Sequence, residues 1–190
     1  MIPFNRLGFL FKVFGSAIYP REVRDRLADV CRDLWREARI LDLGGGTGVL
    51  ADLAYGARKD LLCIILDPAR GMLRYSGPHA LKAAGIAEEL PFKAGMFDAV
   101  LIGDALHHFG DPDQAFSETR RVLKKEGVLF VFDMDPGHFM GSLIRAAEKL
   151  LGEPAHFFPP GLLSRLLEGH GFTTRLDRYG WRYSITARSR

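Results

Sequence analysis

The chain has 190 residues, of which 47% are hydrophobic and 26% are charged, and its formal net charge is +3. A chain of this length and composition can bury one hydrophobic core, so we expect a single domain over residues 1–190. The weak positive charge does not demand a nucleic-acid partner, and none is expected. It is compatible with an anionic ligand or with peripheral contact at a membrane surface.

The apolar N-terminal run and the two cysteines indicate where the protein works. The run over residues 7–18 is interrupted by Lys12 and Gly15, and it is shorter than the roughly 20 residues that a membrane span needs. No small-residue cleavage site follows it, which argues against a signal peptide. Cys31 and Cys63 lie in apolar, helix-like and strand-like surroundings that favour two buried thiols over a disulfide. We therefore expect a cytoplasmic protein without stable membrane insertion.

Hydrophobic periodicity predicts an alternation of strands and helices. Two amphipathic helices, over residues 5–14 and 21–36, precede the core. Strands are predicted over residues 39–43, 61–66, 79–84, 97–102 and 128–132, with helices beginning at residue 49, around residues 72–73 and over residues 112–123. A helix over residues 140–151, a proline-rich turn at residues 158–161, a helix over residues 162–169 and two strands over residues 172–176 and 182–187 complete the pattern. This order predicts an α/β fold with a mainly parallel sheet, helices on both faces and a closing antiparallel strand pair.

A glycine-rich turn, DLGGGTG over residues 42–48, lies between the first predicted strand and a helix. Glycines at such a place let the backbone approach a nucleotide-like ligand closely. A dinucleotide-binding fingerprint requires glycine or alanine at its last position, where this chain has Val49. A tight turn without a ligand is the alternative interpretation.

Asp67 ends the second predicted strand, about 20 residues beyond the glycines, where a carboxylate can bind both hydroxyls of a ribose. A helix N-cap is the competing interpretation for this residue.

The acid-x-G-x-G-x-G order resembles motif I of the class I S-adenosylmethionine (SAM) dependent methyltransferases. The segment DPARGML over residues 67–73 is similar to the family's D-x-S-x-x-M-L, whose methionine packs on adenine. Further blocks resemble the family at residues 88–92, 97–100, 106–112 and 121–127. The resemblance runs from residue 40 to residue 133 and is strongest to the branch that contains the ubiquinone and menaquinone C-methyltransferases and many small-molecule methyltransferases.

This resemblance implies SAM as the cofactor and a Rossmann-like methyltransferase fold with a seven-stranded sheet. It divides the chain into N-terminal helices or a lid (residues 1–37), a SAM-binding core (38–135) and C-terminal helices with closing strands (136–190). The residues expected to bind the cofactor are Asp42, Gly44, Gly45, Gly46, Gly48, Asp67, Pro68, Met72, Ile86, Ala87, Gly103 and Asp104.

The chain departs from the family pattern in four respects. Ile86 stands where the family often has an aspartate for the adenine amino group, and Ala69 lacks the serine hydroxyl. The helix after Asp67 is also short by comparison with the family. The tyrosine-rich N-terminal signature of the quinone enzymes is not evident, so their substrate is not transferred to this chain.

Methyl transfer from a sulfonium is an in-line displacement that needs alignment and, for a weakly acidic acceptor, a base. Asp104, His107 and His108 follow the fourth predicted strand, at the edge where open α/β sheets bind ligands, and they are the candidate catalytic residues. A histidine that merely supports the loop is the alternative.

A metal cluster of Asp133, Asp135 and His138 is a further alternative, because D-x-D with a nearby histidine offers suitable ligands. We interpret these residues as part of a loop that follows a strand, and no metal is expected.

Aromatic residues suggest how an acceptor is enclosed. Seven phenylalanines could wall an acceptor pocket beneath an N-terminal lid, which the residues before Arg21 would form. Ordinary core packing is the alternative. The seven are Phe4, Phe9, Phe11, Phe14, Phe139, Phe157 and Phe158. The arginine-rich C-terminal part could bind phosphate or lipid headgroups, and a solvated surface is the alternative interpretation.

The sequence therefore predicts SAM-dependent methyl transfer to a small, partly hydrophobic acceptor. A SAM-binding domain without catalysis is the main alternative. An RNA or protein methyltransferase is disfavoured, because the chain has neither an added nucleic-acid module nor an Asn-Pro-Pro-Tyr type motif. The acceptor and the oligomeric state are left open.

Overall fold

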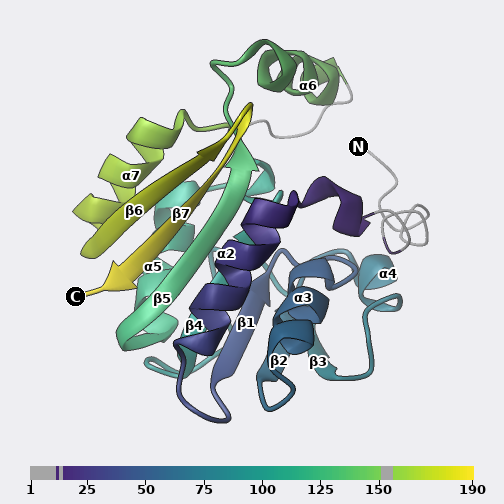
Figure 1. The fold of residues 1–190 in the computed structure, drawn as a ribbon, viewed down its shortest axis with the longest axis vertical. Helices are drawn as coiled ribbons and strands as arrows, with labels where there is room; N and C mark the ends of the chain where they lie inside the picture. The colour runs from purple at the N-terminus through teal and green to yellow at the C-terminus, as the bar shows by residue number, and fades with distance from the viewer. Residues whose placement is uncertain (1–11, 13–14, 151–155) are drawn as a thin grey trace.

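The structure is a computed structural model that describes residue 12 and residues 15–150 and 156–190. Its centre is a seven-stranded sheet in the order β3-β2-β1-β4-β5-β7-β6 (Figure 1). The strands are β1 (Arg39–Leu43), β2 (Leu62–Leu66), β3 (Ala80–Ala83), β4 (Phe97–Gly103), β5 (Leu123–Met134), β6 (Phe172–Tyr179) and β7 (Arg182–Ser189). The first five are parallel, whereas β7 is antiparallel to both β5 and β6. The predicted fold class is confirmed.

Helices cover both faces of this sheet (Figure 1). The helical elements are η1 (Gly15–Ile18), α2 (Arg21–Arg32), α3 (Val49–Ala57), α4 (Arg70–Leu73), η2 (Leu106–His108), α5 (Pro112–Val122), α6 (Phe139–Leu150) and α7 (Pro160–Gly169). Side chains of α2 and α3 pack into one hydrophobic cluster, and those of α5 and α7 pack into a second one. Neighbouring residues of a strand alternate between the two clusters, as with Ile40 and Leu41 of β1. The inner strands contain unbroken apolar runs, such as residues 99–102 of β4 and 128–132 of β5, because both of their faces are buried there.

Helix α2 ends at Arg32, earlier than the predicted boundary at residue 36. The guanidinium of Arg58, just after α3, donates to the carbonyl oxygens of Cys31 at 3.0 Å, Leu34 at 2.6 Å and Trp35 at 3.0 Å. Carbonyl groups at a helix end lack partners within the helix, and here a distant side chain satisfies them. The predicted C-terminal end of α2 was wrong because Arg58, which binds these carbonyl groups, lies far along the chain.

The C-terminal strands are longer than predicted. Strand β5 begins at Leu123 rather than residue 128, and its pairing with β4 shifts register between Phe97 and Ala99, where an irregularity absorbs the extra residues. Strands β6 and β7 pair over their whole length, from Phe172 with Ser189 to Tyr179 with Arg182. The helix predicted over residues 5–14 lies outside the described residues apart from Lys12.

Both cysteines are buried free thiols, as predicted, and burial raises the pKa of Cys31 and of Cys63 to about 12.

Candidate functional site

The candidate site lies at the carboxyl ends of the parallel strands. The sheet order runs from β1 to β2 and β3 on one side and to β4 and β5 on the other. Such a reversal of strand order opens a crevice at the carboxyl edge, where open α/β sheets bind their ligands. The glycine turn follows β1, Asp67 follows β2, and Asp104 follows β4. The sequence therefore places three predicted site segments along one edge.

The glycine turn has a backbone that side chains would strain. Gly44, Gly46 and Gly48 have φ angles of +68°, +52° and +78°, in the left-handed region that favours glycine. The amide of Gly44 donates to the carbonyl of Leu66 at 2.8 Å, which holds the turn against the end of β2. Gly48 is the N-cap residue of α3. The turn thus exposes its backbone at the start of a helix, where anionic and polar ligand groups are favoured.

Asp42 supports this turn from beneath. Its side chain is only 1% exposed, and its Oδ2 accepts a hydrogen bond from the amide of Ala51 at 3.0 Å. A Cβ atom on Gly45 would lie 2.5 Å from the Asp42 carboxyl carbon, so only glycine fits there. Burial raises the pKa of Asp42 to about 7. The hydrogen bond from the Ala51 amide opposes this increase, and the nearby charge of Asp67 adds to it.

Asp67 connects the end of β2 to the glycine turn. Its Oδ2 accepts from the amide of Gly46 at 2.9 Å, and its Oδ1 accepts from the amide of Ala69 at 2.7 Å. Burial raises the pKa of Asp67, and the two backbone hydrogen bonds oppose that increase. The N-cap residue of α4 is Ala69, which makes no side-chain cap bond, so Asp67 is not itself that N-cap. A Cβ atom on Gly46 would lie 3.4 Å from Met72 Cε and 3.8 Å from Asp67 Oδ2.

The structure thus brings Gly46, Asp67 and Met72 together. Of the other predicted cofactor residues, Pro68 and Ile86 are exposed, whereas Ala87 is buried in the core cluster on the side of α5.

A buried histidine–aspartate pair lies beside Asp104. Nδ1 of His107 is 3.0 and 3.2 Å from the two carboxylate oxygens of Asp133, and both side chains are 1% exposed. The ring of Phe157 stacks on His107 with centroids 4.2 Å apart. Asp104 has a left-handed φ of +54°, and its amide donates to the carbonyl of Phe132 at 2.9 Å. A hydrogen bond between Nδ1–H and Asp133 selects the tautomer of His107 whose Nε2 can accept a proton.

Charges around Asp104 set its proton affinity. Burial raises the pKa of Asp104, His107 and Arg182 oppose the increase, and Asp133 adds to it. His108, the third candidate for catalysis, is half-buried next to His107, with ring centroids 4.2 Å apart. The three predicted catalytic residues therefore lie together.

Tyr19 belongs to the same region, and the sequence reasoning did not assign it to the site. Its ring centroid is 5.0 Å from that of Phe132, and a Cβ atom on Gly103 would lie 2.5 Å from its hydroxyl oxygen. Burial raises the pKa of Tyr19, and Asp104 and Asp42 add to the increase. The only signal in the sequence is one tyrosine just before Pro20, which does not reveal this contact.

The alternative metal cluster does not come together as the D-x-D pattern suggests. The Asp135 carboxylate accepts from Arg178 at 3.0 Å and from the amide of Gly137 at 2.9 Å. Among the described residues, the group of three acidic and imidazole side chains whose ligand atoms all lie within 4.8 Å of one another is instead Asp104, His107 and Asp133. The hydrogen bond between His107 and Asp133 already occupies two members of this group.

The three described members of the predicted aromatic set are divided between two places. Phe157, which stacks on His107, and Phe158 border the same hollow, whereas Phe139 is exposed on α6. The four N-terminal phenylalanines lie outside the described residues.

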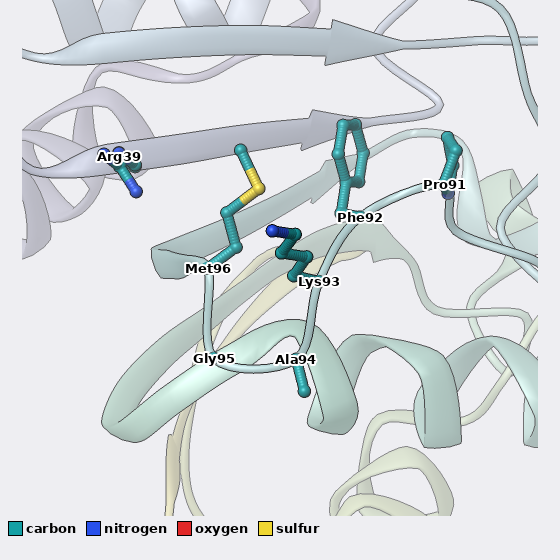
Figure 2. Close-up of a pocket in the computed structure, with 7 residues that line it drawn as sticks. All are labelled: Arg39, Pro91, Phe92, Lys93, Ala94, Gly95 and Met96. Carbon is teal, nitrogen blue, oxygen red and sulfur yellow. The ribbon is translucent and has the colours of Figure 1, made fainter.

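Two surface hollows differ in their relation to this site. Figure 2 shows one of about 520 Å³, lined by Arg39 at the start of β1 and by residues 91–96 before β4. It lies at the amino ends of the strands, opposite the candidate site. The other hollow, of about 570 Å³, lies between α5 and α7. Phe157 borders this hollow and also stacks on His107, so the hollow is close to the candidate site.

Comparisons with known proteins agree with this geometry. Residues 41–131 match the family described as methyltransferase domain. The chain is 35% identical over 128 residues to an uncharacterized methyltransferase of Mycobacterium tuberculosis, covering 61% of this chain and 49% of the relative. It is 37% identical over 122 residues to a malonyl-[acyl-carrier protein] O-methyltransferase of Methylococcus capsulatus, covering 60% and 44%.

Among solved structures, a SAM-dependent methyltransferase of Thermotoga maritima, described as a possible histamine N-methyltransferase, has the same fold. It superposes with a TM-score of 0.76 at 22% identity and covers 98% of each chain. The chain spans about half the length of the curated relatives it matches.

Proposed function

We propose that this chain, which carries a class I SAM-dependent methyltransferase domain, transfers the methyl group of SAM to a small, partly hydrophobic acceptor. The observation that carries the proposal is the contact between Asp67 and the left-handed glycine turn at the carboxyl edge of the sheet. The family and the fold imply SAM as the cofactor. The acceptor class is supported by the predicted apolar N-terminal cover and by the relatives named malonyl-[acyl-carrier protein] O-methyltransferases.

The residues present fit that cofactor. Gly46 leaves open the space that a side chain would fill next to Met72 and Asp67, and its backbone can therefore approach a ligand closely. Asp67 would accept hydrogen bonds from the ribose hydroxyls, and Met72 would pack on the adenine. When bound, the cofactor supplies a methyl group on a positively charged sulfur that is open to in-line displacement.

Asp104 is the proposed base for an acceptor that must lose a proton. It follows β4 at the crevice, it is only half-buried, and its raised pKa makes its carboxylate a stronger proton acceptor than an exposed aspartate. His107 is buried and held by Asp133, so we assign it a positioning role beside Asp104. His108 is the alternative base.

The segment before α2 would cover the acceptor side. Lys12 binds the Asp52 carboxylate on α3, and Arg182 of β7 donates to the carbonyl of Ile18. Tyr19 then lies over Gly103 at the end of β4. A cover held at Lys12 and at Ile18 would exclude water from the transferred methyl group.

Transfer of a tritiated methyl group from SAM to a panel of small acceptors tests this function. The panel needs hydrophobic acids, phenols, amines and an acyl-carrier thioester, and calorimetry with S-adenosylhomocysteine measures cofactor binding separately. We expect tight binding and turnover with at least one apolar acceptor. Binding without any turnover would favour the cofactor-binding domain without catalysis.

A pH profile tests the role of Asp104. The activity of the unmodified chain should rise as pH increases through the raised pKa of Asp104, because the base acts when deprotonated. Asp104→Asn should abolish this limb and lower turnover by about 10²-fold or more. An unchanged pH profile in the Asp104→Asn variant would show that Asp104 is not the base. His108 would then be the base, or the reaction would need none.

A further inference from the structure

Helix α6 carries an apolar stripe that the described part of the molecule does not cover. Phe139 is 77% exposed, Leu143 is 54% exposed and Leu150 is 88% exposed. Leu143 lies about one helical turn after Phe139, and Leu150 lies about two turns after Leu143. The three side chains therefore lie along one side of the helix. Met140 is also exposed. Large apolar side chains gathered on one exposed face mark a docking surface more often than isolated ones do.

The helix is anchored at its first turn. The amide of Ser142 donates to the carbonyl of His138 at 2.9 Å, and its hydroxyl donates to the carbonyl of Pro136 at 2.7 Å. A Cβ atom on Gly141 would collide with the carbonyl oxygen of Asp135. Figure 1 shows α6 beyond the tip of β5, away from the helices that cover the sheet. The anchored start fixes α6 at the carboxyl edge.

Basic and aromatic residues lie beside this stripe. The amide of Asp135 donates to the carbonyl of Trp181 at 3.0 Å, which places the turn between β6 and β7 against the loop that precedes α6. Next to this turn, the guanidinium of Arg182 at the start of β7 lies 4.0 Å from the Trp181 ring centroid. Arg178, near the end of β6, is the more exposed member of its ion pair with Asp135. The sequence of α6 adds two basic residues against one acidic residue.

We propose that α6 and the β6–β7 turn dock on an anionic lipid bilayer. An apolar stripe flanked by lysine, arginine and tryptophan is the composition of helices that lie in the membrane interface. Net charges of +3 on two copies of the chain would repel each other, whereas an anionic bilayer attracts this surface. Among the described residues, no helix meets the length and hydropathy that a membrane span requires.

Vesicle flotation with the full chain tests the proposal independently of methyl transfer. The protein should float with vesicles that contain phosphatidylglycerol, should remain behind with phosphatidylcholine alone, and should be released by high salt. Leu143→Glu should weaken partitioning by about tenfold or more, because it places a charge where an exposed apolar side chain would enter the bilayer. Leu81→Glu, on the exposed side of β3, is the matched control and should bind as the unmodified chain does.

Tryptophan fluorescence gives a second readout, because the chain has two tryptophans in different places. Trp35 precedes β1 at the amino ends of the parallel strands, whereas Trp181 lies in the β6–β7 turn beside the carboxyl end of β5. Brominated lipids should quench Trp181 in a Trp35→Phe variant and should leave Trp35 unquenched in a Trp181→Phe variant. Far-UV circular dichroism checks that each variant is folded.

Three results would overturn the proposal. The first is an absence of vesicle binding by the unmodified chain, and the second is equal binding by the Leu143→Glu variant. The third is a dimer in light scattering that Leu143→Glu dissociates, since the stripe would then be an interface between copies.

Discussion

Replacement of Asp42 by asparagine should stabilise the protein at neutral and basic pH and should change little in acid. Burial raises the pKa of Asp42 from its ordinary value of 3.8 to about 7 in the folded chain. Between these values the folded state holds a proton that the unfolded state has lost, so the free energy of unfolding falls as pH rises. At about 1.4 kcal/mol for each pH unit, the full loss is about 4 kcal/mol above pH 7.

Asparagine removes this loss because it is never ionised. The protonated form of Asp42 and the asparagine that replaces it have nearly the same shape, and each keeps one oxygen to accept the Ala51 amide. The two proteins should therefore have similar stability near pH 4 and should differ by up to about 4 kcal/mol near pH 8.

Urea denaturation followed by circular dichroism, over a series of pH values, measures this difference. Asp60→Asn is the control of opposite sign. The guanidinium of Arg58 holds the pKa of Asp60 below its usual range, so that variant should lose stability above about pH 4. Parallel stability curves for the unmodified chain and Asp42→Asn would refute the reasoning about Asp42.

Three further predictions concern the cofactor edge. Asp67→Ala should weaken S-adenosylhomocysteine binding by about tenfold or more in calorimetry, because charge-assisted hydrogen bonds to the ribose are lost. NAD is the control ligand, and it should not bind. Unchanged affinity in a folded variant would limit the role of Asp67 to holding Gly46. Gly103→Ala should lower the free energy of unfolding by about 1–3 kcal/mol, since its Cβ would displace the hydroxyl of Tyr19, and an unaltered urea midpoint would contradict this packing. Deletion of residues 1–18 should reduce methyl transfer far more than S-adenosylhomocysteine affinity, whereas full turnover by the truncated chain would show that the segment is only structural.

Local sequence patterns were sufficient for the strands and the glycine turn. Ile40 and Leu41 both face buried clusters, so a short, continuously apolar run identifies an inner parallel strand without knowledge of its partners. The glycines that need left-handed backbone angles also stand out in the sequence, because other residues rarely adopt them.

Contacts between distant residues could not be predicted in the same way. His107, in η2, was identified as a candidate, but its partner Asp133 is 26 residues away, on β5. The D-x-D pattern suggested a different role for Asp133. The end of α2 depends on Arg58, which follows a different helix. Local periodicity carries no information on either pairing, because each depends on which strands and helices become neighbours.

The place of β7 in the sheet has a consequence for synthesis on the ribosome. This strand follows β6 along the chain, yet it lies between β5 and β6 and pairs with both. Until residues 182–189 have emerged, β5 presents an unpaired apolar edge and β6 has no neighbour. Such edges pair readily with other chains, so the nascent protein is open to aggregation until residues 182–189 are available. Slow translation just before the codons for these residues should therefore harm the yield of folded protein more than a comparable delay before β5.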